Sequence, residues 1–519
     1  MHNHLKFSLP DEYNPQQLTG ALADHYAIKK ERPVLKRMAI YDTFDWRLFN
    51  KSFILYTSED KLFLRKLFQN AVIQSVAITS PPVFIWDFPD GELKERLAPV
   101  LRMRALFKLI ELHSRLMGHR ILNSDEKTVA RLIYEEVKSA REKNAPVLAT
   151  YLWLQPVKGY TKDCQNLTKH LEKAGFATHK KEDIYFKAIE AAGKNPGSYS
   201  SKLKIQLDPA MRSDEAAKII LRYLLQIMKI NEAYLEKDLD TEFLHDFRVA
   251  IRRTRSALGQ IKSVFPQNTT GRFKKEFAYV GKLSNQLRDL DVYLLKEDAF
   301  KAMLPPVLRD DIAPLFDYLR KNRSKALQQV IRGLKSKKYA QIMQDWETFL
   351  DEPVQDPPKA SSADVPIIAL ARKRIYRQYR RIVEDGSRIL DNTEDAKLHA
   401  LRIECKKLRY LMEFFSSLFP HKKINILIVQ LKTLQDNLGD FNDLCVQEEY
   451  LLNIAGELPS THRKAKKSLV AIGSLIAALD REKQIIKDAF AKTFTDYASP
   501  PNKKAFGELF ASKQKETTP

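Results

Sequence analysis

The stretch HDFRVAIRRTRSALGQIKSVFP, from His245 to Pro266, predicts an amphipathic helix with a strongly basic face. When successive residues are placed about 100° apart, Arg248, Arg252 and Arg255 fall within a quarter-turn of His245, and Arg253 flanks them. One face can therefore be buried while the other presents a row of guanidinium groups. The opposite, apolar side carries Phe247, Ala250, Ile251, Leu258 and Ile261.

The same pattern returns between His399 and Pro420, as HALRIECKKLRYLMEFFSSLFP, at a constant offset of 154 residues. The offset continues without a gap through Asp289 and Asp443 as far as Val292 and Val446. An internal repeat of this length indicates a duplicated supersecondary unit. The repeat matches His245, Arg248, Arg252, Arg253 and Arg255 with His399, Arg402, Lys406, Lys407 and Arg409.

Two features of the sequence resemble the CHAD domain (conserved histidine α-helical domain). They are the doubled H-x-x-R-V/I-x-x-R/K-R/K-x-R helix and the RDLDV segment at Arg288–Val292. The resemblance covers about Met211 to Phe510 and implies an all-α domain of two pseudo-symmetric four-helix bundles. It also implies that a basic groove forms where the two histidine-bearing helices meet, and that inorganic polyphosphate binds there.

Helical apolar spacing runs through both repeats, which we place at about 212–352 and 367–510 of a helical domain 212–510. Glu352–Pro366 contains four prolines and is predicted to connect the two bundles. The polar tail after Pro500 is expected to fray. The predicted helices are 213–237, 241–264, 270–297, 307–335 and 337–351, then 367–390, 394–418, 421–454 (continuous or broken at Gly439) and 460–495.

Residues 1–205 have a different pattern, in which short apolar or alternating stretches are separated by turn residues. This pattern predicts an α+β domain built on an antiparallel sheet or barrel. Helices are predicted at Asn14–Tyr26 and Tyr160–Ala174, and Ala192–Ser201 is a predicted linker. The predicted strands are Leu5–Leu9, Ser52–Tyr56, Lys61–Leu64, Val83–Trp86, Val129–Val137 and Leu148–Leu154.

Two segments of this first domain, Tyr41–Leu48 (YDTFDWRL) and Gly159–Lys162 (GYTK), resemble the CYTH or triphosphate-tunnel family, which implies a tunnel-like antiparallel barrel. The sequence departs from the family at its E-x-E-x-K opening, where HNHLK at residues 2–6 keeps only the lysine. It departs again at the L-R-x-R strand, which is LYTS at residues 55–58. Glu135 and Glu136 are neighbours on a strand and should point to opposite faces. Since phosphoryl transfer depends on such carboxylates and arginines, we predict a degenerate, structural tunnel.

The chain carries 87 Lys and Arg against 65 Asp and Glu, and its formal net charge of +22 favours a polyanionic partner. The three cysteines show no C-x-x-C pairing and fit a reducing compartment, with Cys405 on an apolar face as a buried thiol. Because no basic segment precedes an apolar run, we expect a cytoplasmic protein that does not span a membrane. The pairs His113 with His119 and His2 with His4 lack a third ligand, so no metal or cofactor is expected.

The basic faces allow two interpretations: solvated charge, or a groove whose like charges are offset by a bound polyanion. The duplication favours the groove, in which each histidine either donates to phosphate or orients a neighbouring side chain. Asp289 and Asp443 are predicted to pair with arginines of the histidine helices. The predicted polyphosphate contacts are His245, Arg248, Arg252, Arg253, Arg255, His399, Arg402, Lys406, Lys407 and Arg409, and further candidates are Lys274, Lys282, Lys373, Arg377, Arg380, Arg381 and Lys432.

The sequence thus favours a polyphosphate-binding protein over an enzyme, and we assign no catalytic residue. Two alternatives stay open: hydrolysis of triphosphate or polyphosphate by the N-terminal domain, and general nucleic-acid binding. Tyr376, Tyr379 and Tyr410 lie among basic residues, which would suit base stacking, although no nucleic-acid motif accompanies them. Nucleic acid is the less favoured partner, and association with polyphosphate granules stays open.

Overall fold

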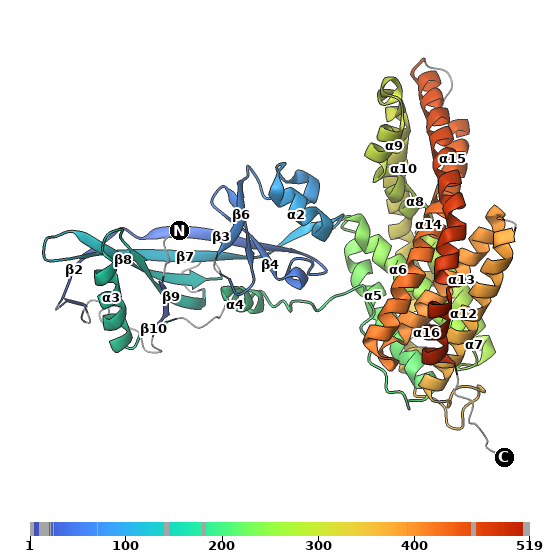
Figure 1. The fold of residues 1–519 in the computed structure, drawn as a ribbon, viewed down its shortest axis with the longest axis horizontal. Helices are drawn as coiled ribbons and strands as arrows, with labels where there is room; N and C mark the ends of the chain where they lie inside the picture. Colours follow the sequence, from blue (N-terminus) through green and yellow to red (C-terminus); the bar gives the residue numbers. More distant parts are fainter. Residues whose placement is uncertain are drawn as a thin grey trace. The chain divides into compact units, whose positions relative to one another are not determined.

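A computed structural model describes residues 5–9, 20, 22–23, 25–69, 71–139, 145–178, 183–391, 393–457 and 463–511. The chain divides into two compact units, Met1–Ser200 and Ser201–Pro519, each with its own core (Figure 1). The first unit is α+β with an antiparallel sheet and the second is all-α, which confirms the predicted fold class.

The first unit is built around one antiparallel sheet. The long strand β7 is its centre and pairs with β2, β3 and β8. The strand order is β10-β1-β9-β8-β7-β3-β4-β5-β6. The strands are β1 (Leu5–Ser8), β2 (Ala27–Lys30), β3 (Val34–Thr43), β4 (Phe53–Ser58), β5 (Lys61–Lys66), β6 (Val72–Ala77), β7 (Leu106–Leu122), β8 (Thr128–Lys138), β9 (Val147–Pro156) and β10 (Ala177–Thr178).

Three helices accompany the sheet: α2 (Glu92–Leu101), α3 (Thr161–Lys173) and α4 (Ile184–Ala191). The structure confirms the predicted helix at 160–174 and five of the six predicted strands. The strand predicted at Val83–Trp86 is wrong: this apolar run forms a loop and the short 3₁₀ helix η2 (Ile85–Asp87). The side chain of Asp87 accepts hydrogen bonds from the amides of Val83 and Phe84, which holds the loop in place of a strand ladder. Most of the predicted helix 14–26 lies outside the described residues.

The second unit repeats its architecture at the predicted offset. Helices α5, α6 and α7 begin 154 residues before α12, α13 and α14, respectively. The first repeat contains α5 (Ser213–Leu235), α6 (Thr241–Gln260), α7 (Gln267–Leu283), α8 (Asn285–Leu294), α9 (Glu297–Met303), α10 (Ala313–Leu334) and α11 (Lys337–Asp351). The second contains α12 (Ile367–Asp391), α13 (Asp395–Phe414), α14 (His421–Glu457), α15 (Arg463–Tyr497) and α16 (Pro500–Phe510).

The two repeats join through a short symmetric backbone pairing. The amide of Ser213 donates to the carbonyl of Val365 at 3.0 Å, and the amide of Ile367 donates to the carbonyl of Met211 at 2.9 Å. Each bond is the 154-residue equivalent of the other, and the bridge between Arg212 and Pro366 lies between them. A pseudo-twofold axis therefore passes through this point, and the equivalent helices α6 and α13 pack against each other across it.

Two details of the helical unit differ from the sequence prediction, and a third decides between two predicted alternatives. The helix predicted at 270–297 is interrupted at the fully buried Ser284, which separates α7 from α8. Helix α14 continues through Gly439 without a break. The expectation that the chain frays after Pro500 is wrong for residues 500–510, which form α16. Phe506 of this helix is fully buried and stacks on Tyr379, with 3.9 Å between the ring centroids, because α16 completes the core of the second bundle.

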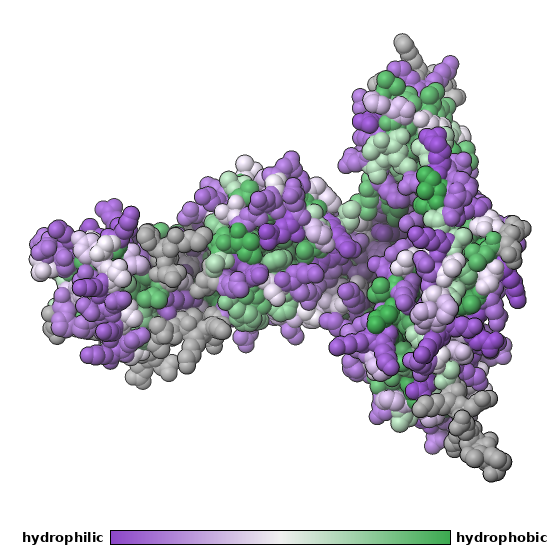
Figure 2. Space-filling model, in the orientation of Figure 1, coloured by the Kyte–Doolittle hydropathy of each residue, from purple (hydrophilic) through white to green (hydrophobic). Residues whose placement is uncertain are grey.

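The visible surface of the helical unit is largely hydrophilic, with apolar residues interspersed (Figure 2). This is expected for amphipathic helices whose apolar faces form one shared core. In the part of the chain that the structure describes, no helix has the length and apolar character needed to cross a membrane.

The packing of α12 against α15 generates a stability prediction. A methyl group at Gly386 would overlap the ring of the buried Phe494, whereas Gly473 has open space where a side chain would point. Gly386→Ala should lower the free energy of unfolding by about 1–3 kcal/mol through overpacking. The matched change Gly473→Ala should raise it by roughly 0.8–1 kcal/mol through helix propensity. Urea denaturation of the full chain measures both, and equal effects at the two sites would contradict the packing.

Candidate functional site

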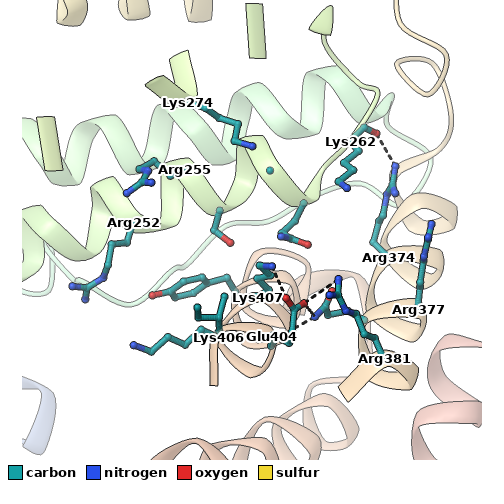
Figure 3. A pocket seen from close by; sticks show the side chains of 16 residues that line it. Arg252, Arg255, Lys262, Lys274, Arg374, Arg377, Arg381, Glu404, Lys406 and Lys407 are labelled. Carbon is teal, nitrogen blue, oxygen red and sulfur yellow. Dashed lines mark hydrogen bonds and ion pairs between the residues drawn. The ribbon is translucent and has the colours of Figure 1, made fainter. Parts of the chain in front are cut away.

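A groove of about 590 Å³ opens between α6, α12 and α13, and α7 contributes to its rim. Figure 3 shows that arginine and lysine side chains from these four helices line the groove. The residues that line it are Arg252, Arg255, Ser256, Gly259, Gln260, Lys262, Lys274, Arg374, Arg377, Gln378, Arg381, Ile403, Glu404, Lys406, Lys407 and Tyr410.

The groove holds an uncompensated positive charge. Nine of its lining residues are arginine or lysine and one, Glu404, is acidic. Among the described residues, only Arg381 and Lys407 of these nine lie within 4.0 Å of a carboxylate. The seven others are Arg252, Arg255, Lys262, Lys274, Arg374, Arg377 and Lys406.

The groove follows from the amphipathic pattern of α6 and α13. On α6, Phe247, Ala250 and Ile251 are buried in the core, while Arg252 and Arg255 are exposed on the other side. The equivalent apolar positions of α13 are likewise buried, including the thiol of Cys405, as predicted. Because α6 and α13 pack together across the pseudo-twofold, their cationic faces converge.

Two buried polar atoms at the groove have no hydrogen-bond partner among the described residues. They are Oγ of Ser256 and Nε of Arg374. The terminal nitrogen of Arg374 donates to the carbonyl of Lys262 at 2.9 Å, which fixes the guanidinium at the rim. A buried donor without a partner costs about 1–3 kcal/mol, so these two atoms mark places where the groove wall is less than fully satisfied.

Glu404 forms a rigid part of the groove wall. It accepts hydrogen bonds at 2.7 Å from both Gln378 and Lys407, and Arg381 lies 3.6 Å away. Burial opposes ionisation of this carboxyl group, but the hydrogen bonds from Lys407 and Gln378 outweigh it and lower its pKa. Glu404 therefore stays charged at neutral pH and positions its cationic neighbours.

Lys406 carries the clearest electrostatic signature in the groove. Its pKa is lowered to about 8 because its ammonium group is largely buried and lies beside the charges of Arg402 and Arg252. Burial, followed by the neighbouring Arg377, lowers the pKa of Arg374 in the same way. Like charges therefore act on one another across the two repeats.

Several predicted contacts lie beside the groove and support it. Arg248 donates to the carbonyl of Gly281 and the side chains of Ser284 and Asn285. Arg402 pairs with Asp443 at 3.3 Å, as predicted for that acid. The pKa of Asp289 is raised by burial and lowered in part by Arg248 and Arg288. These contacts hold the two histidine helices against their neighbours, next to the residues that line the groove.

The two histidines also lie outside the groove lining. His399 is exposed on α13, and its Nδ1 is 2.5 Å from Oδ1 of Asn442. His245 is half-buried on α6. Of the further candidates, Lys274, Arg377 and Arg381 line the groove, whereas Lys282 and Lys432 are exposed elsewhere on α7 and α14. Two further lining residues, Lys262 and Arg374, were not among the predicted contacts. Lys262 is placed by the turn that ends α6.

The pseudo-equivalent cleft on the other side of the axis is closed. Arg253, the equivalent of Lys407, is buried and donates to Glu413 and to the carbonyl of Ser201, both at 2.8 Å. Arg409 pairs with the same Glu413 at 2.7 Å. The segment 201–207 runs over this side, where the carbonyl of Lys202 accepts from Tyr223 and the side chains of Ile205 and Leu207 are buried. Of the two equivalent positions, the one between α6, α12 and α13 therefore forms the open basic groove in the described part of the chain.

In the first unit, the positions that match the tunnel family are used for structure. The ring of Tyr56, in the LYTS strand, stacks on Phe63 with 5.1 Å between centroids. The ammonium of Lys6 lies 3.4 Å from the ring centre of Tyr151. Arg65 and Asp183 form a buried ion pair with nitrogen and oxygen 2.5 Å apart.

The two neighbouring acids of β8 point to opposite faces, as predicted. Glu135 accepts from Nε1 of Trp153 at 2.7 Å, and Glu136 pairs with Lys138 at 3.5 Å. Residues 2–4 of the HNHLK segment, which aligns with the family's opening motif, lie outside the described residues. In the described part, no three His, Cys, Asp or Glu side chains gather as metal ligands. Lys6, Arg65, Glu135 and Glu136 are thus each committed to a ring or an ion pair within the unit and do not form a magnesium–triphosphate site in this arrangement.

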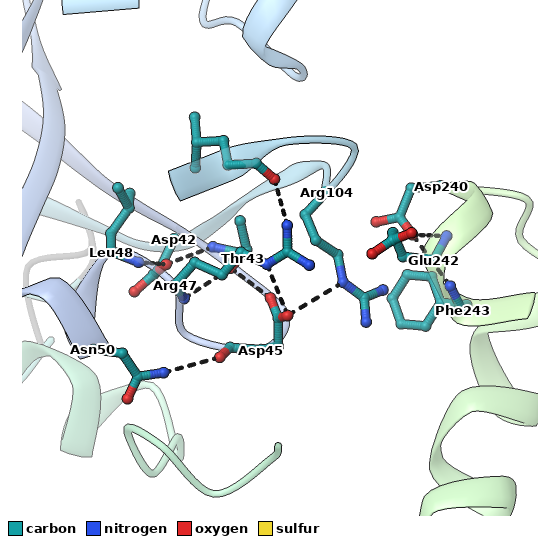
Figure 4. Close-up of polar contacts among 11 residues, drawn as sticks. Asp42, Thr43, Asp45, Arg47, Leu48, Asn50, Arg104, Asp240, Glu242 and Phe243 are labelled. Carbon is teal, nitrogen blue, oxygen red and sulfur yellow. Dashed lines mark hydrogen bonds and ion pairs between the residues drawn. The ribbon is translucent and has the colours of Figure 1, made fainter. Parts of the chain in front are cut away.

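The acids of the YDTFDWRL element stabilise a turn. Figure 4 shows the side chain of Asp42 facing the backbone of this turn, where it accepts from the amides of Thr43, Leu48 and Phe49 at 2.7–2.9 Å. Burial raises the pKa of Asp42 to about 7, although these three hydrogen bonds oppose the rise. Asp45 pairs with Arg47 at 2.9 Å. The element therefore builds the end of β3.

Comparison with known proteins identifies the class of the helical unit. Residues 219–452 match the family model described as the CHAD domain. The chain therefore carries a CHAD domain, which confirms the resemblance inferred from the doubled histidine helix. No match was found among curated proteins.

Three solved structures resemble parts of the chain. The CHAD domain from the plant Ricinus communis is 23% identical, with a TM-score of 0.48, and covers 56% of this chain and 95% of that one. PptA from Streptomyces chartreusis is 19% identical, with a TM-score of 0.43, and covers 55% of this chain and 99% of that one. HpAC1 from Hippeastrum, described as having a dominant triphosphatase activity, is 14% identical, with a TM-score of 0.24, and covers 38% of this chain and 100% of that one.

The lowered pKa of Lys406 can be tested directly. Lysine NMR on the full chain, with Lys406→Arg used for assignment, should show Lys406 titrating near pH 8. In Arg252→Ala the midpoint should move to higher pH, because one like charge is removed. The same midpoint in both proteins would show that charges of the first repeat do not act on Lys406.

Proposed function

We propose that the protein binds inorganic polyphosphate in the groove between α6, α12 and α13. The observation that carries this proposal is the set of seven cations in one groove with no carboxylate within 4.0 Å among the described residues. CHAD domains are associated with polyphosphate, and a linear phosphate polymer is the partner whose charge density matches such a groove.

Each class of lining residue has a distinct part in this binding. The guanidinium groups of Arg252, Arg255 and Arg377 stay charged and can grip two phosphate oxygens at once. The ammonium groups of Lys274 and Lys406 act as point charges. In this proposal, the groove geometry is held by four residues outside the lining, namely Arg248, Arg402, His245 and His399.

Nucleic acid is the principal competitor for such a groove. Tyr410 is the one aromatic residue among its lining residues, so the groove offers little surface for successive bases to stack. A polymer without bases therefore fits the lining better. The N-terminal unit does not favour triphosphate hydrolysis, because Lys6, the one residue that it keeps from the family's opening motif, packs on the ring of Tyr151, and Glu135 is hydrogen-bonded to Trp153. Where polyphosphate granules occur, the proposal extends to association with them.

Polyphosphate binding should be tight, salt-sensitive and weakened by changes on both repeats. We expect labelled long-chain polyphosphate to bind the wild type, and single-stranded DNA of matched charge to compete poorly. Arg252→Ala/Lys406→Ala should lower the affinity by roughly tenfold or more. If the groove engages about six to eight phosphates, the slope of log affinity against log salt should be roughly −4 to −6.

Lys321→Ala/Lys325→Ala is the matched control, since both residues are exposed on α10 and lie outside the groove lining. This control should bind like the wild type. Equal competition by DNA would make the groove a general polyanion surface. A slope near zero, or no binding, would refute the electrostatic account.

The pH dependence of binding should follow Lys406. Below about pH 7 the ammonium is already protonated in the free protein, so affinity should be level. A bound polyanion raises its pKa, so above pH 8 binding requires uptake of a proton, and affinity falls by up to about tenfold per pH unit. Titration between pH 6 and 9 measures the fall, which Lys406→Arg should remove. A fall that persists in Lys406→Arg would assign it to another group.

A further inference from the structure

A second basic cavity lies on the outer face of α12, next to the groove. Its volume is about 570 Å³, and its lining residues are Lys373, Tyr376, Arg377, Arg380, Arg381, Glu384 and Phe510. Lys373, Arg377, Arg380 and Arg381 are all exposed. Phe510 belongs to α16, so the closing helix of the chain forms one wall.

The two cavities are contiguous. Arg377 and Arg381 line both of them. A polyanion that lies against these two arginines in the groove can therefore continue over α12 to Lys373 and Arg380 without leaving cationic side chains.

The charge on this face is only weakly compensated. Lys373 and Arg377 have no carboxylate within 4.0 Å among the described residues. Arg381 lies 3.6 Å from the buried Glu404 of the groove wall. On the exposed helix itself, Arg380 is 3.5 Å from Glu384, and Arg381 is 3.5 Å from Asp385, in pairs between neighbouring turns. Such surface pairs contribute about 0–1 kcal/mol and are readily exchanged for phosphate contacts.

Duplication does not account for this basic face. The equivalents of Lys373, Arg377, Arg380 and Arg381 on α5 are Ile219, Tyr223, Gln226 and Ile227. The α5 side is the one that segment 201–207 covers, whereas α12 borders the open groove. The basic residues therefore occur on one repeat only, and on the side where a ligand can continue out of the groove.

We infer that the outer face of α12 is an extension site for the same polyphosphate chain, formed by Lys373, Arg377, Arg380 and Arg381. The inference rests on the proposed function. It assigns Lys373 and Arg380 to contacts that only a chain longer than the groove can make. The site therefore gives the protein a preference for long polyphosphate.

Binding of two chain lengths separates this site from the groove. In the full chain, Lys373→Ala/Arg380→Ala should bind tripolyphosphate like the wild type. It should bind long-chain polyphosphate roughly tenfold more weakly, and the salt slope should become shallower by about 1.4, or about 0.7 for each lost contact. The charge-conserving variant Lys373→Arg/Arg380→Lys should retain most of the long-chain affinity.

Lys321→Ala/Lys325→Ala removes the same charge from α10 and should leave binding of both lengths unchanged. Equal losses for the two lengths, or no loss for the long chain, would overturn the extension site while leaving the groove in place. A wild type that binds neither length would overturn the proposed function and the extension site together. Equal loss for DNA of matched charge would make this face a general polyanion surface and overturn its assignment to polyphosphate.

Discussion

Packing of α6 against α13 is the interaction on which the helical unit depends. The apolar sides of both helices are buried, so their cationic sides must converge at the pseudo-twofold. The consequence is visible at Lys406, whose pKa falls to about 8 through burial and the charges of Arg402 and Arg252. The core that stabilises the fold thus creates a concentration of like charge that a bound polyanion relieves.

The duplication is broken where the ligand site forms. On one side of the axis, Glu413 neutralises Arg253 and Arg409, and segment 201–207 covers the cleft. On the other side, the equivalent of Glu413 is Gly259, which leaves Arg255 without a carboxylate among the described residues. A duplicated sequence can therefore form a site on one side of the axis only. A few substitutions and one covering segment determine which cleft stays open.

Sequence patterns predicted the helices and the repeat well because both depend on local periodicity, and α6 and α13 begin at or within one residue of the predicted positions 241 and 394. The residues that line the groove were harder to predict from the sequence. Arg253 belongs to the basic stripe by spacing, but its ion pair with Glu413 depends on contacts between repeats. Lys262 follows the end of α6, where helical spacing no longer gives its direction. Helix α16 was missed because its apolar residues, Phe506 and Phe510, are few and are stabilised by tertiary packing.

The central claim is that like charges in the groove repel one another and that a bound polyanion offsets this repulsion. The stability of Lys406→Met without ligand tests this claim most directly. Methionine keeps the length of the side chain and removes its charge. At pH 7 and low salt the account predicts that the variant is more stable than the wild type, on the order of 1 kcal/mol after solvent screening, while it binds polyphosphate more weakly. The difference in stability should shrink at high salt. A variant that is less stable than the wild type at low salt would contradict the account.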